Sequence, residues 1–277
     1  MEKILYVTDA VKLNRPCLDF ACYISNLTHS KLTGVFLENQ ILELRSSEAI
    51  QEIAISPAVP GASLEGQKEL YRDENIDLFK HVCENNGVNC FIHQDTGMPV
   101  TEVVAESRYT DLIVVDATTS FSWRPEIAPT VFVKEVLEKS ECPVIIAPED
   151  FEGVNEIIFT YNGSSSSVFA IKQFTHLFPQ LRDRKITVLS ITDAGKPIKG
   201  DKDKLKEWLQ AHYDQITFVV LEDRNVRARL LEYLVEKEQV FIVMGAFGRS
   251  ILSNVIIPNP ADPIVKLITQ PIFITHY

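Results

Sequence analysis

The chain of 277 residues contains one pattern twice, and this internal repeat limits its possible folds more than any other feature. Four short apolar segments of the first half return in the same order in the second half. The pairs are 3–9 with 156–162, 31–37 with 185–191, 111–117 with 240–246, and 142–147 with 270–275. Four matches in one order indicate duplication of a folding unit. We therefore predict two tandem domains, residues 1–150 and residues 151–277.

Segments with helical periodicity separate these apolar runs. In the first half, apolar side chains recur at the spacing of one helix face at Cys17, Phe20, Ala21, Ile24 and Leu27, and the second half repeats most of this spacing. Further helices are predicted at 67–85, 100–108, 130–139, 202–212, 226–237 and 262–269. Apolar strands that alternate with helices indicate a parallel sheet covered on both faces. Each half is therefore expected to be a doubly wound α/β domain.

The halves differ in length mainly through an insertion, residues 40–66, after the second strand of the first half. The simplest interpretation is an exposed loop that extends the next helix. The alternative is a lid or an element that docks a partner.

Charge and hydropathy narrow the classes of function. The formal net charge is −11, and residues 1–150 carry 12 Lys and Arg against 24 Asp and Glu, whereas residues 151–277 carry 15 against 14. A nucleic-acid or anionic-membrane surface needs a basic footprint, so neither partner is expected. The sequence has no apolar run near 20 residues and starts directly with a strand pattern, so we expect a cytoplasmic protein without a signal peptide.

The cysteines and histidines give little indication of a metal site. The five cysteines are odd in number and form no Cys-x-x-Cys pair, so we interpret them as reduced core thiols. One grouping, His81, Cys83, Cys90 and His93, has the residue types of a zinc site. Positions i and i+2 on a helix point in different directions, however, so no metal site is predicted. No catalytic residue emerges from the spacing of acids, bases or nucleophiles either.

The segment after the strand at 240–244 has the geometry of an anion-binding loop. Gly245-x-x-Gly248 follows the strand directly, and glycines let backbone N–H groups turn toward a phosphate. After nine intervening residues, where a second pair of small residues would complete such a loop, the chain has Pro258 and Asn259. Proline offers no N–H, so the loop is only partly suited to a polyphosphate.

On its strand–helix order, its duplication and its Gly-x-x-Gly loop, the chain resembles the tandem universal stress proteins. The resemblance covers nearly all of the sequence outside 40–66. It implies a five-stranded parallel sheet of order 3-2-1-4-5 in each domain. It also implies an ATP site between strands one and four, with an acidic residue after strand one and a loop of Gly-x-x-Gly, nine residues and Gly-Ser/Thr after strand four. Members of the family commonly pair through their fifth strands, which implies an internal pseudo-dimer or a homodimer through 143–147 and 271–275.

Carried over residue by residue, the resemblance favours the second domain as a nucleotide site. The candidate binding residues are Asn162, Gly245, Gly248, Arg249 and Asn259. Asn162 stands where the family has its acid, and Arg249 is either a phosphate partner or a solvated loop residue. The expected cofactor is at most a weakly bound ATP or another adenine nucleotide.

The first domain keeps Asp9 after its first strand but departs from the rest of the pattern. Asp116 and Thr119 stand in place of the two early glycines, and Pro129 and Thr130 in place of the later pair. We expect this half to bind no polyphosphate. The leading interpretation is a stress-response binding or regulatory module rather than an enzyme. The alternatives are an ATP-binding switch with slow hydrolysis and a ligand-free scaffold for protein contacts.

Overall fold

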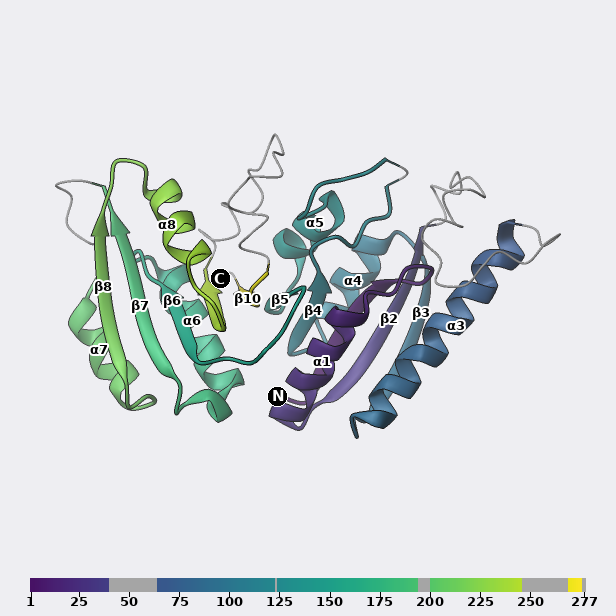
Figure 1. Cartoon of the computed structure of the whole chain (residues 1–277), viewed down its shortest axis with the longest axis horizontal. Helices are drawn as coiled ribbons and strands as arrows, with labels where there is room; N and C mark the ends of the chain where they lie inside the picture. The colour runs from purple at the N-terminus through teal and green to yellow at the C-terminus, as the bar shows by residue number, and fades with distance from the viewer. Residues whose placement is uncertain (40–63, 123, 194–199, 246–268, 276–277) are drawn as a thin grey trace. The chain divides into compact units, whose positions relative to one another are not determined.

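The computed structural model describes residues 1–39, 64–122, 124–193, 200–245 and 269–275. These residues form two compact units, Met1–Cys142 and Pro143–Tyr277. In both units, helices lie on both faces of a mainly parallel sheet (Figure 1). The α/β class predicted from the alternation of strands and helices is therefore confirmed.

The first unit contains a four-stranded parallel arrangement, β3-β2-β1-β4. Its elements are β1 (Lys3–Asp9), α1 (Arg15–Thr28), β2 (Lys31–Asn39), α3 (Leu64–Asn85), β3 (Cys90–Gly97), α4 (Pro99–Ser107), β4 (Leu112–Asp116) and α5 (Val131–Lys139). All five residues of β4 are buried, as are six of the seven residues of β1. Burial on both faces explains why these strands are continuous apolar runs in the sequence.

The second unit contains the strand order β5-β10-β9-β6-β7-β8. Its elements are β5 (Val144–Ala147), β6 (Glu156–Thr160), α6 (Ser165–Leu177), the short 3₁₀ helix η2 (Pro179–Leu181), β7 (Lys185–Thr192), α7 (Lys202–Gln210), β8 (Ile216–Glu222), α8 (Val226–Val235), β9 (Val240–Met244) and β10 (Ile272–Ile274). Within the second half of the chain, β8-β7-β6-β9-β10 is the expected order 3-2-1-4-5.

The sheet of the second unit differs from the expected purely parallel, five-stranded sheet in one place. Strand β5 pairs with β10 in antiparallel direction, with Ile145 opposite Phe273. The family resemblance implied this pairing of 143–147 with 271–275. It also explains why the second compact unit begins at Pro143 although the repeat places the boundary after residue 150.

An aromatic cluster forms the core of the second unit. The ring of Phe174 on α6 lies 4.9 Å from Phe241 on β9 and 5.3 Å from Phe273 on β10, measured between centroids. All three side chains are fully buried. Edge-to-face contacts of this kind fix the helix over the two strands beyond simple burial.

Helix boundaries agree with the sequence prediction to within a few residues. Helix α1 begins after Asn14, whose Oδ1 accepts a hydrogen bond from the Cys17 N–H at 2.9 Å, and it ends at His29 in the left-handed conformation. The predicted helix 262–269 and nearly all of the insertion 40–66 lie outside the described residues.

Candidate functional site

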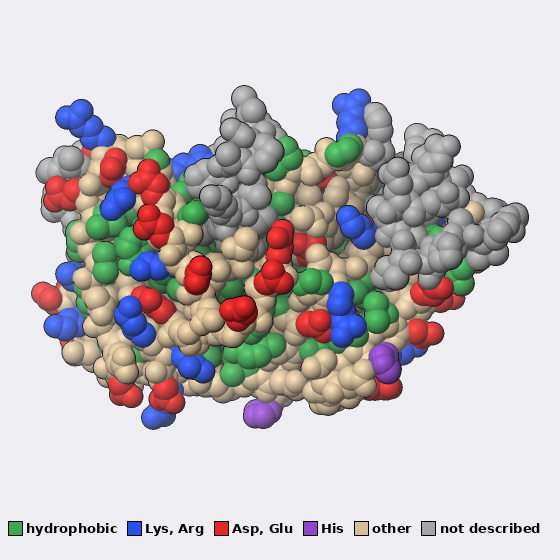
Figure 2. All heavy atoms as spheres, in the orientation of Figure 1, with side chains coloured by type: hydrophobic (Ala, Val, Ile, Leu, Met, Phe, Trp, Pro, Cys, Tyr) green, Lys and Arg blue, Asp and Glu red, His purple; other side chains and the backbone are tan. Residues whose placement is uncertain are grey.

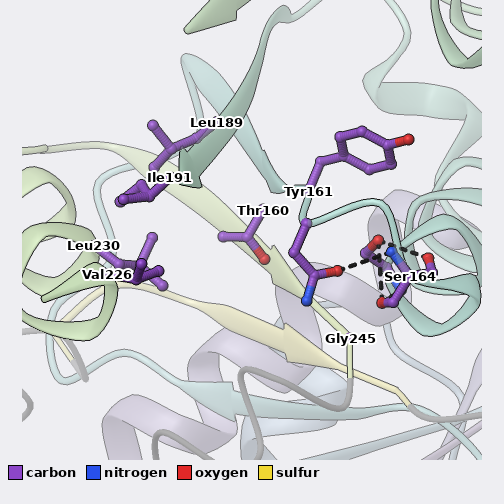
Figure 3. A pocket seen from close by; sticks show the side chains of 10 residues that line it. Thr160, Tyr161, Ser164, Leu189, Ile191, Val226, Leu230 and Gly245 are labelled. Carbon is purple, nitrogen blue, oxygen red and sulfur yellow. Dashed lines mark hydrogen bonds between the residues drawn. The ribbon is translucent and has the colours of Figure 1, made fainter. Parts of the chain in front are cut away.

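A small cavity lies at the point of the second unit where the strand order reverses. Strand β6 has β7 on one side and β9 on the other, so the chain leaves the carboxyl ends of β6 and β9 in opposite directions. Open α/β sheets bind ligands at this position. The cavity has a volume of about 120 Å³, and its lining residues are Thr160, Tyr161, Asn162, Ser164, Ser167, Leu189, Ile191, Val226, Leu230 and Gly245 (Figure 3).

The cavity has an apolar side and a polar side. In Figure 3 the aliphatic side chains of β7 and α8 lie on one side, Ser164 lies on the other, and Thr160 projects between them. Pockets for whole drug-sized ligands measure roughly 300–1,000 Å³. A cavity of about 120 Å³ therefore suits one flat ring or sugar, with the rest of a larger ligand outside it.

The polar side is built by a tight turn that leads into α6. The Oδ1 atom of Asn162 accepts a hydrogen bond from the Ser164 N–H at 3.0 Å, and Gly163 has a φ of 77°. The Ser164 hydroxyl then caps the helix by accepting from the Ser167 N–H at 3.2 Å. No acidic side chain lies in the first turn of α6, so the positive end of the helix dipole is not neutralised there.

Gly245 closes the cavity where β9 ends, and its lack of a side chain has a packing reason. A Cβ atom at this position would lie 2.6 Å from the backbone oxygen of Ser166 and 2.8 Å from its carbonyl carbon. The backbone after β9 thus packs directly against the first turn of α6. The sequence suggested a glycine that serves a phosphate, and the structure adds that the fold of this unit requires the same glycine.

Tyr161 provides a hydroxyl group that stays protonated at neutral pH. Its side chain is only 3% exposed. Burial raises the pKa of Tyr161, and the nearby Asp201 raises it further. A neutral phenol can donate a hydrogen bond as well as accept one.

Of the five binding residues predicted from the sequence, the structure brings Asn162 and Gly245 to one cavity. Gly248, Arg249 and Asn259 lie outside the described residues. Sequence reasoning missed the apolar wall, which consists of Leu189, Ile191, Val226 and Leu230. The signal was present in the spacing, because i and i+2 on a strand, and i and i+4 on a helix, share one face.

At the equivalent place in the first unit, the side chain of Asp116 occupies the space after β4. Its Oδ2 atom accepts hydrogen bonds from Asn14 Nδ2 at 2.9 Å and from the Thr118 hydroxyl, and its Oδ1 atom accepts from the Thr118 N–H at 3.2 Å. Asn14 is also the N-cap of α1. The carboxylate therefore ties the strand end to the helix that would otherwise face a ligand.

Hydrogen bonds and a ring contact also hold the loop after Asp116 against the start of α5. The Thr130 hydroxyl donates to the carbonyl oxygen of Thr119, and the Thr130 N–H donates to the carbonyl oxygen of Ala117 at 3.2 Å. The ring of Phe121 packs on Phe132 with centroids 4.8 Å apart. The N–H groups of Thr119 and Thr130, which would have to turn toward a phosphate, thus donate to carbonyl oxygens within the protein.

Asp9 is the acidic residue that the family resemblance implies after the first strand, and its carboxylate is also held by a hydrogen bond within the protein. Its Oδ1 atom accepts from the Val11 N–H at 2.9 Å, and its side chain is 5% exposed. This turn matches the Asn162–Ser164 turn of the second unit in kind, since in both the side-chain oxygen accepts a hydrogen bond from the N–H two residues further along the chain.

The described residues give no sign of a metal centre or of a membrane-spanning helix. There, no group of three or more His, Cys, Asp and Glu side chains has the arrangement to hold a metal ion. Among the same residues, no helix combines the length and apolarity that would be needed to cross a membrane. On the face shown in Figure 2, Lys and Arg side chains alternate with Asp and Glu instead of gathering into one basic patch.

Comparison with known proteins finds solved structures that share this fold. No protein-family model matches the chain, and no curated protein matches it in sequence. Solved structures match it over nearly its whole length, among them the following two. A universal stress protein from Archaeoglobus fulgidus DSM 4304 has a TM-score of 0.65 and 12% identity, covering 99% of this chain and 98% of its own. A putative universal stress protein from Pseudomonas aeruginosa UCBPP-PA14 has a TM-score of 0.56 and 14% identity, covering 100% and 93%. The chain therefore has the fold of universal stress proteins.

Proposed function

We propose that the chain is a tandem universal stress protein, with residues 1–150 and 151–277 as two copies of one domain. Two observations support this proposal: the fourfold repeat in the sequence and the full-length likeness to two universal stress proteins. In this proposal the protein is a stress-response binding or regulatory module of the cytoplasm. The five free cysteines agree with this compartment, because its reducing conditions keep thiols from forming disulfides. Pairing of β5 with β10 supports an internal pseudo-dimer.

The second copy carries the ligand site, and its ligand is an adenine nucleotide or nucleoside. The observation on which this depends is the two-sided cavity at the ends of β6 and β9. The adenine ring fits in the cavity against Leu189, Ile191 and Leu230, and the ribose lies outside it, on the polar side formed by Asn162. The phosphates then extend past Gly245, and the residues proposed to bind them, from the sequence resemblance, are Gly248, Arg249 and Asn259. Pro258 supplies no N–H to them, so ATP gains little over adenosine.

The first copy binds no polyphosphate in this proposal. Asp116 places a carboxylate where the phosphates would lie, and it is already held by Asn14 and Thr118. Phosphate binding would have to break these hydrogen bonds and bring like charges together. The copy instead supports the fold and protein contacts.

Titration calorimetry of the full chain with adenosine, AMP, ADP and ATP tests the ligand site. Ile191→Trp fills the cavity from β7, and we expect it to weaken adenosine binding at least tenfold. Val220→Trp is the matched control, because it makes a similar change at a strand position of β8 that is 44% exposed and outside the cavity. Equal affinity in the wild type and Ile191→Trp would move the site elsewhere.

The position of the phosphates has its own test. We expect Gly248→Asp to weaken ATP binding and to leave adenosine binding unchanged, because the new carboxylate repels only the phosphates. A loss for adenosine as well would place the nucleoside, rather than the phosphates, at this loop.

A second candidate function is a ligand-free scaffold, and the closed loop of the first unit favours it. Mass spectrometry of small molecules released from the purified, denatured protein separates the two. A retained adenine nucleotide supports the binding module, and release of ADP from added ATP would identify a slowly hydrolysing switch. A chain that carries no small molecule and binds none at millimolar ATP would be a scaffold.

A further inference from the structure

Strand β8 of the second unit has one edge without a partner strand. Among the described residues β7 is its only neighbour, and Figure 1 shows β8 as the outermost strand of this unit. Its pairing with β7 runs without interruption to Glu222, so no bulge twists the edge away. Such an edge presents a row of backbone N–H and C=O groups to another chain.

The sequence of β8 lacks the residues that usually protect an edge. Ile216–Glu222 contains no proline and no lysine, and its one charged residue, Glu222, is the last of the strand. Val220, near the middle, is 44% exposed. In the first unit, the third strand of the repeat, β3, carries Asp95 within its sequence. Charged side chains within an edge strand oppose pairing, so β8 is better suited than β3 to accept a partner strand.

The hydrogen bonds with β7 show which residues of β8 face the free edge. The Ile186 N–H donates to the carbonyl oxygen of Gln215 at 2.8 Å, and the Asp223 N–H donates to the carbonyl oxygen of Thr192 at 3.0 Å. Backbone groups turn to alternate sides along a strand, so the odd-numbered residues of β8 bond to β7 and the even-numbered residues face the free edge. These are Ile216, Phe218, Val220 and Glu222.

A second copy of the chain can pair with this edge in antiparallel direction about a two-fold axis. Reciprocal hydrogen bonds then require even-numbered residues opposite each other. An axis at Val219 places Ile216 opposite the second copy's Glu222. It places Phe218 opposite the second copy's Val220 in the same way, so the backbone groups of all four residues are paired. Every other position of the axis leaves at least one of them opposite a residue beyond the partner strand.

The charges that flank β8 favour the same register. With the axis at Val219, Asp214 lies opposite the second copy's Arg224. Both side chains are exposed, and neither forms an ion pair within the part of the chain that the structure describes. Opposite charges directly across an antiparallel pair attract, and like charges repel. An axis at Phe218 would instead place Asp214 opposite the second copy's Glu222.

We propose that β8 is an interaction surface for a second copy of this chain, which adds its own β8 in antiparallel direction about a two-fold axis at Val219. Main-chain hydrogen bonds hold the two strands together, and the pairs of Asp214 with Arg224 fix their register. The surface is distinct from the pairing of β5 with β10, which lies within one chain. It does not depend on the nucleotide proposal.

Crosslinking of the full chain tests the register. At the axis the two Val219 residues form a non-hydrogen-bonded pair with Cα atoms about 4.5 Å apart, which a disulfide can span. We expect Val219→Cys to form a covalent dimer with diamide, which dithiothreitol reverses, and proteolysis to give a peptide joined to itself at position 219. Thr217→Cys is the matched control, because its side chain lies on the same face but opposite the second copy's Leu221. Absence of the crosslink at position 219 would overturn the proposal.

Sedimentation velocity over a range of chain concentrations measures the strength of the dimer. We expect the wild type to dimerise and Asp214→Arg to weaken the dimer roughly tenfold, because like charges then meet at both ends of the paired strands. Adding Arg224→Asp to Asp214→Arg should restore it. Asp77→Arg is the control, since it makes the same charge change at an exposed position of α3.

A wild type that stays monomeric at every concentration, or a double variant that dimerises no better than Asp214→Arg, would also overturn the proposal. Asp214 and Arg224 lie outside the strand, so their exchange tests the register even if Val219→Cys fails to fold.

Discussion

The segments after β4 and β9 occupy the same place in the repeat, and they solve the same structural problem differently. After β9, Gly245 lets the backbone pack against the first turn of α6, and a cavity remains beside it. After β4, Asp116 reaches the N-cap of α1 with its side chain and ties the loop down. A strand end can therefore be joined to its neighbouring helix through backbone contact, as after β9, or through a carboxylate, as after β4.

The largest effect is expected from Gly245→Ala. The new Cβ would meet the Ser166 carbonyl at 2.6 Å, and overpacking against backbone costs about 3 kcal/mol. The free energy of unfolding, from urea denaturation, measures the loss. Gly87→Ala is the control, because its Cβ would meet nothing within 4 Å and only the φ of 65° opposes it, at about 1 kcal/mol. Equal losses would show that the contact with α6 is not what requires the glycine.

Asp116→Ala tests whether the carboxylate holds the loop after β4 to the start of α1. It removes the acceptor for Asn14 and Thr118, and the loss of hydrogen bonds to a charged group should cost about 2 kcal/mol of unfolding free energy. Asp19→Ala is the matched control, since Asp19 forms a half-exposed pair with Arg15 and should cost under about 0.5 kcal/mol. If Asp116→Ala is as mild as the control, the carboxylate does not hold the loop.

The N-cap residues of α5 and α6 allow the two units to be compared at single side chains. Thr130 caps α5 while buried and also donates to the Thr119 carbonyl, whereas Ser164 caps α6 at an exposed position. We expect Thr130→Val to cost about 1.5 kcal/mol and Ser164→Ala about 0.7 kcal/mol. Thermal or urea denaturation of both variants checks the order. The reverse order would mean that the first-unit loop contributes less to stability than its hydrogen bonds indicate.

The smallest effect on stability is expected from Asn162→Asp, which copies Asp9 into the second unit. The new carboxylate still accepts from the Ser164 N–H, so stability should change by less than about 0.5 kcal/mol. Under the proposed function, a charged acceptor should strengthen a ribose hydrogen bond by about 1 kcal/mol, or roughly fivefold in adenosine affinity. Calorimetry measures the adenosine affinity of Asn162→Asp. Asn155→Asp is the control, because it makes the same change of charge outside the cavity. Weaker adenosine binding would remove Asn162 from the ribose site.

The sequence was sufficient for the α/β class and for most element positions. Strands buried on both faces must be continuous apolar runs, and helices on the sheet must show apolar stripes, so both periodicities are visible without coordinates. The pairing of 143–147 with 271–275 was implied by the family resemblance rather than by these periodicities. The direction of that pair and the start of the second compact unit at Pro143 could not be derived from the residues alone, because they depend on which edges meet in space.

The candidate site shows the same division between local pattern and tertiary contact. The sequence by itself predicted that Asn162 and Gly245 come directly after the apolar runs of the first and fourth strands of the second half, where open parallel sheets bind ligands. Only the tertiary structure showed that α8 and β7 supply the apolar wall, that Gly245 is needed against Ser166, and that Asp116 is held by Asn14. Those facts depend on distances between residues up to about a hundred positions apart. Local propensity carries no information about such distances, because packing sets them after the elements have formed.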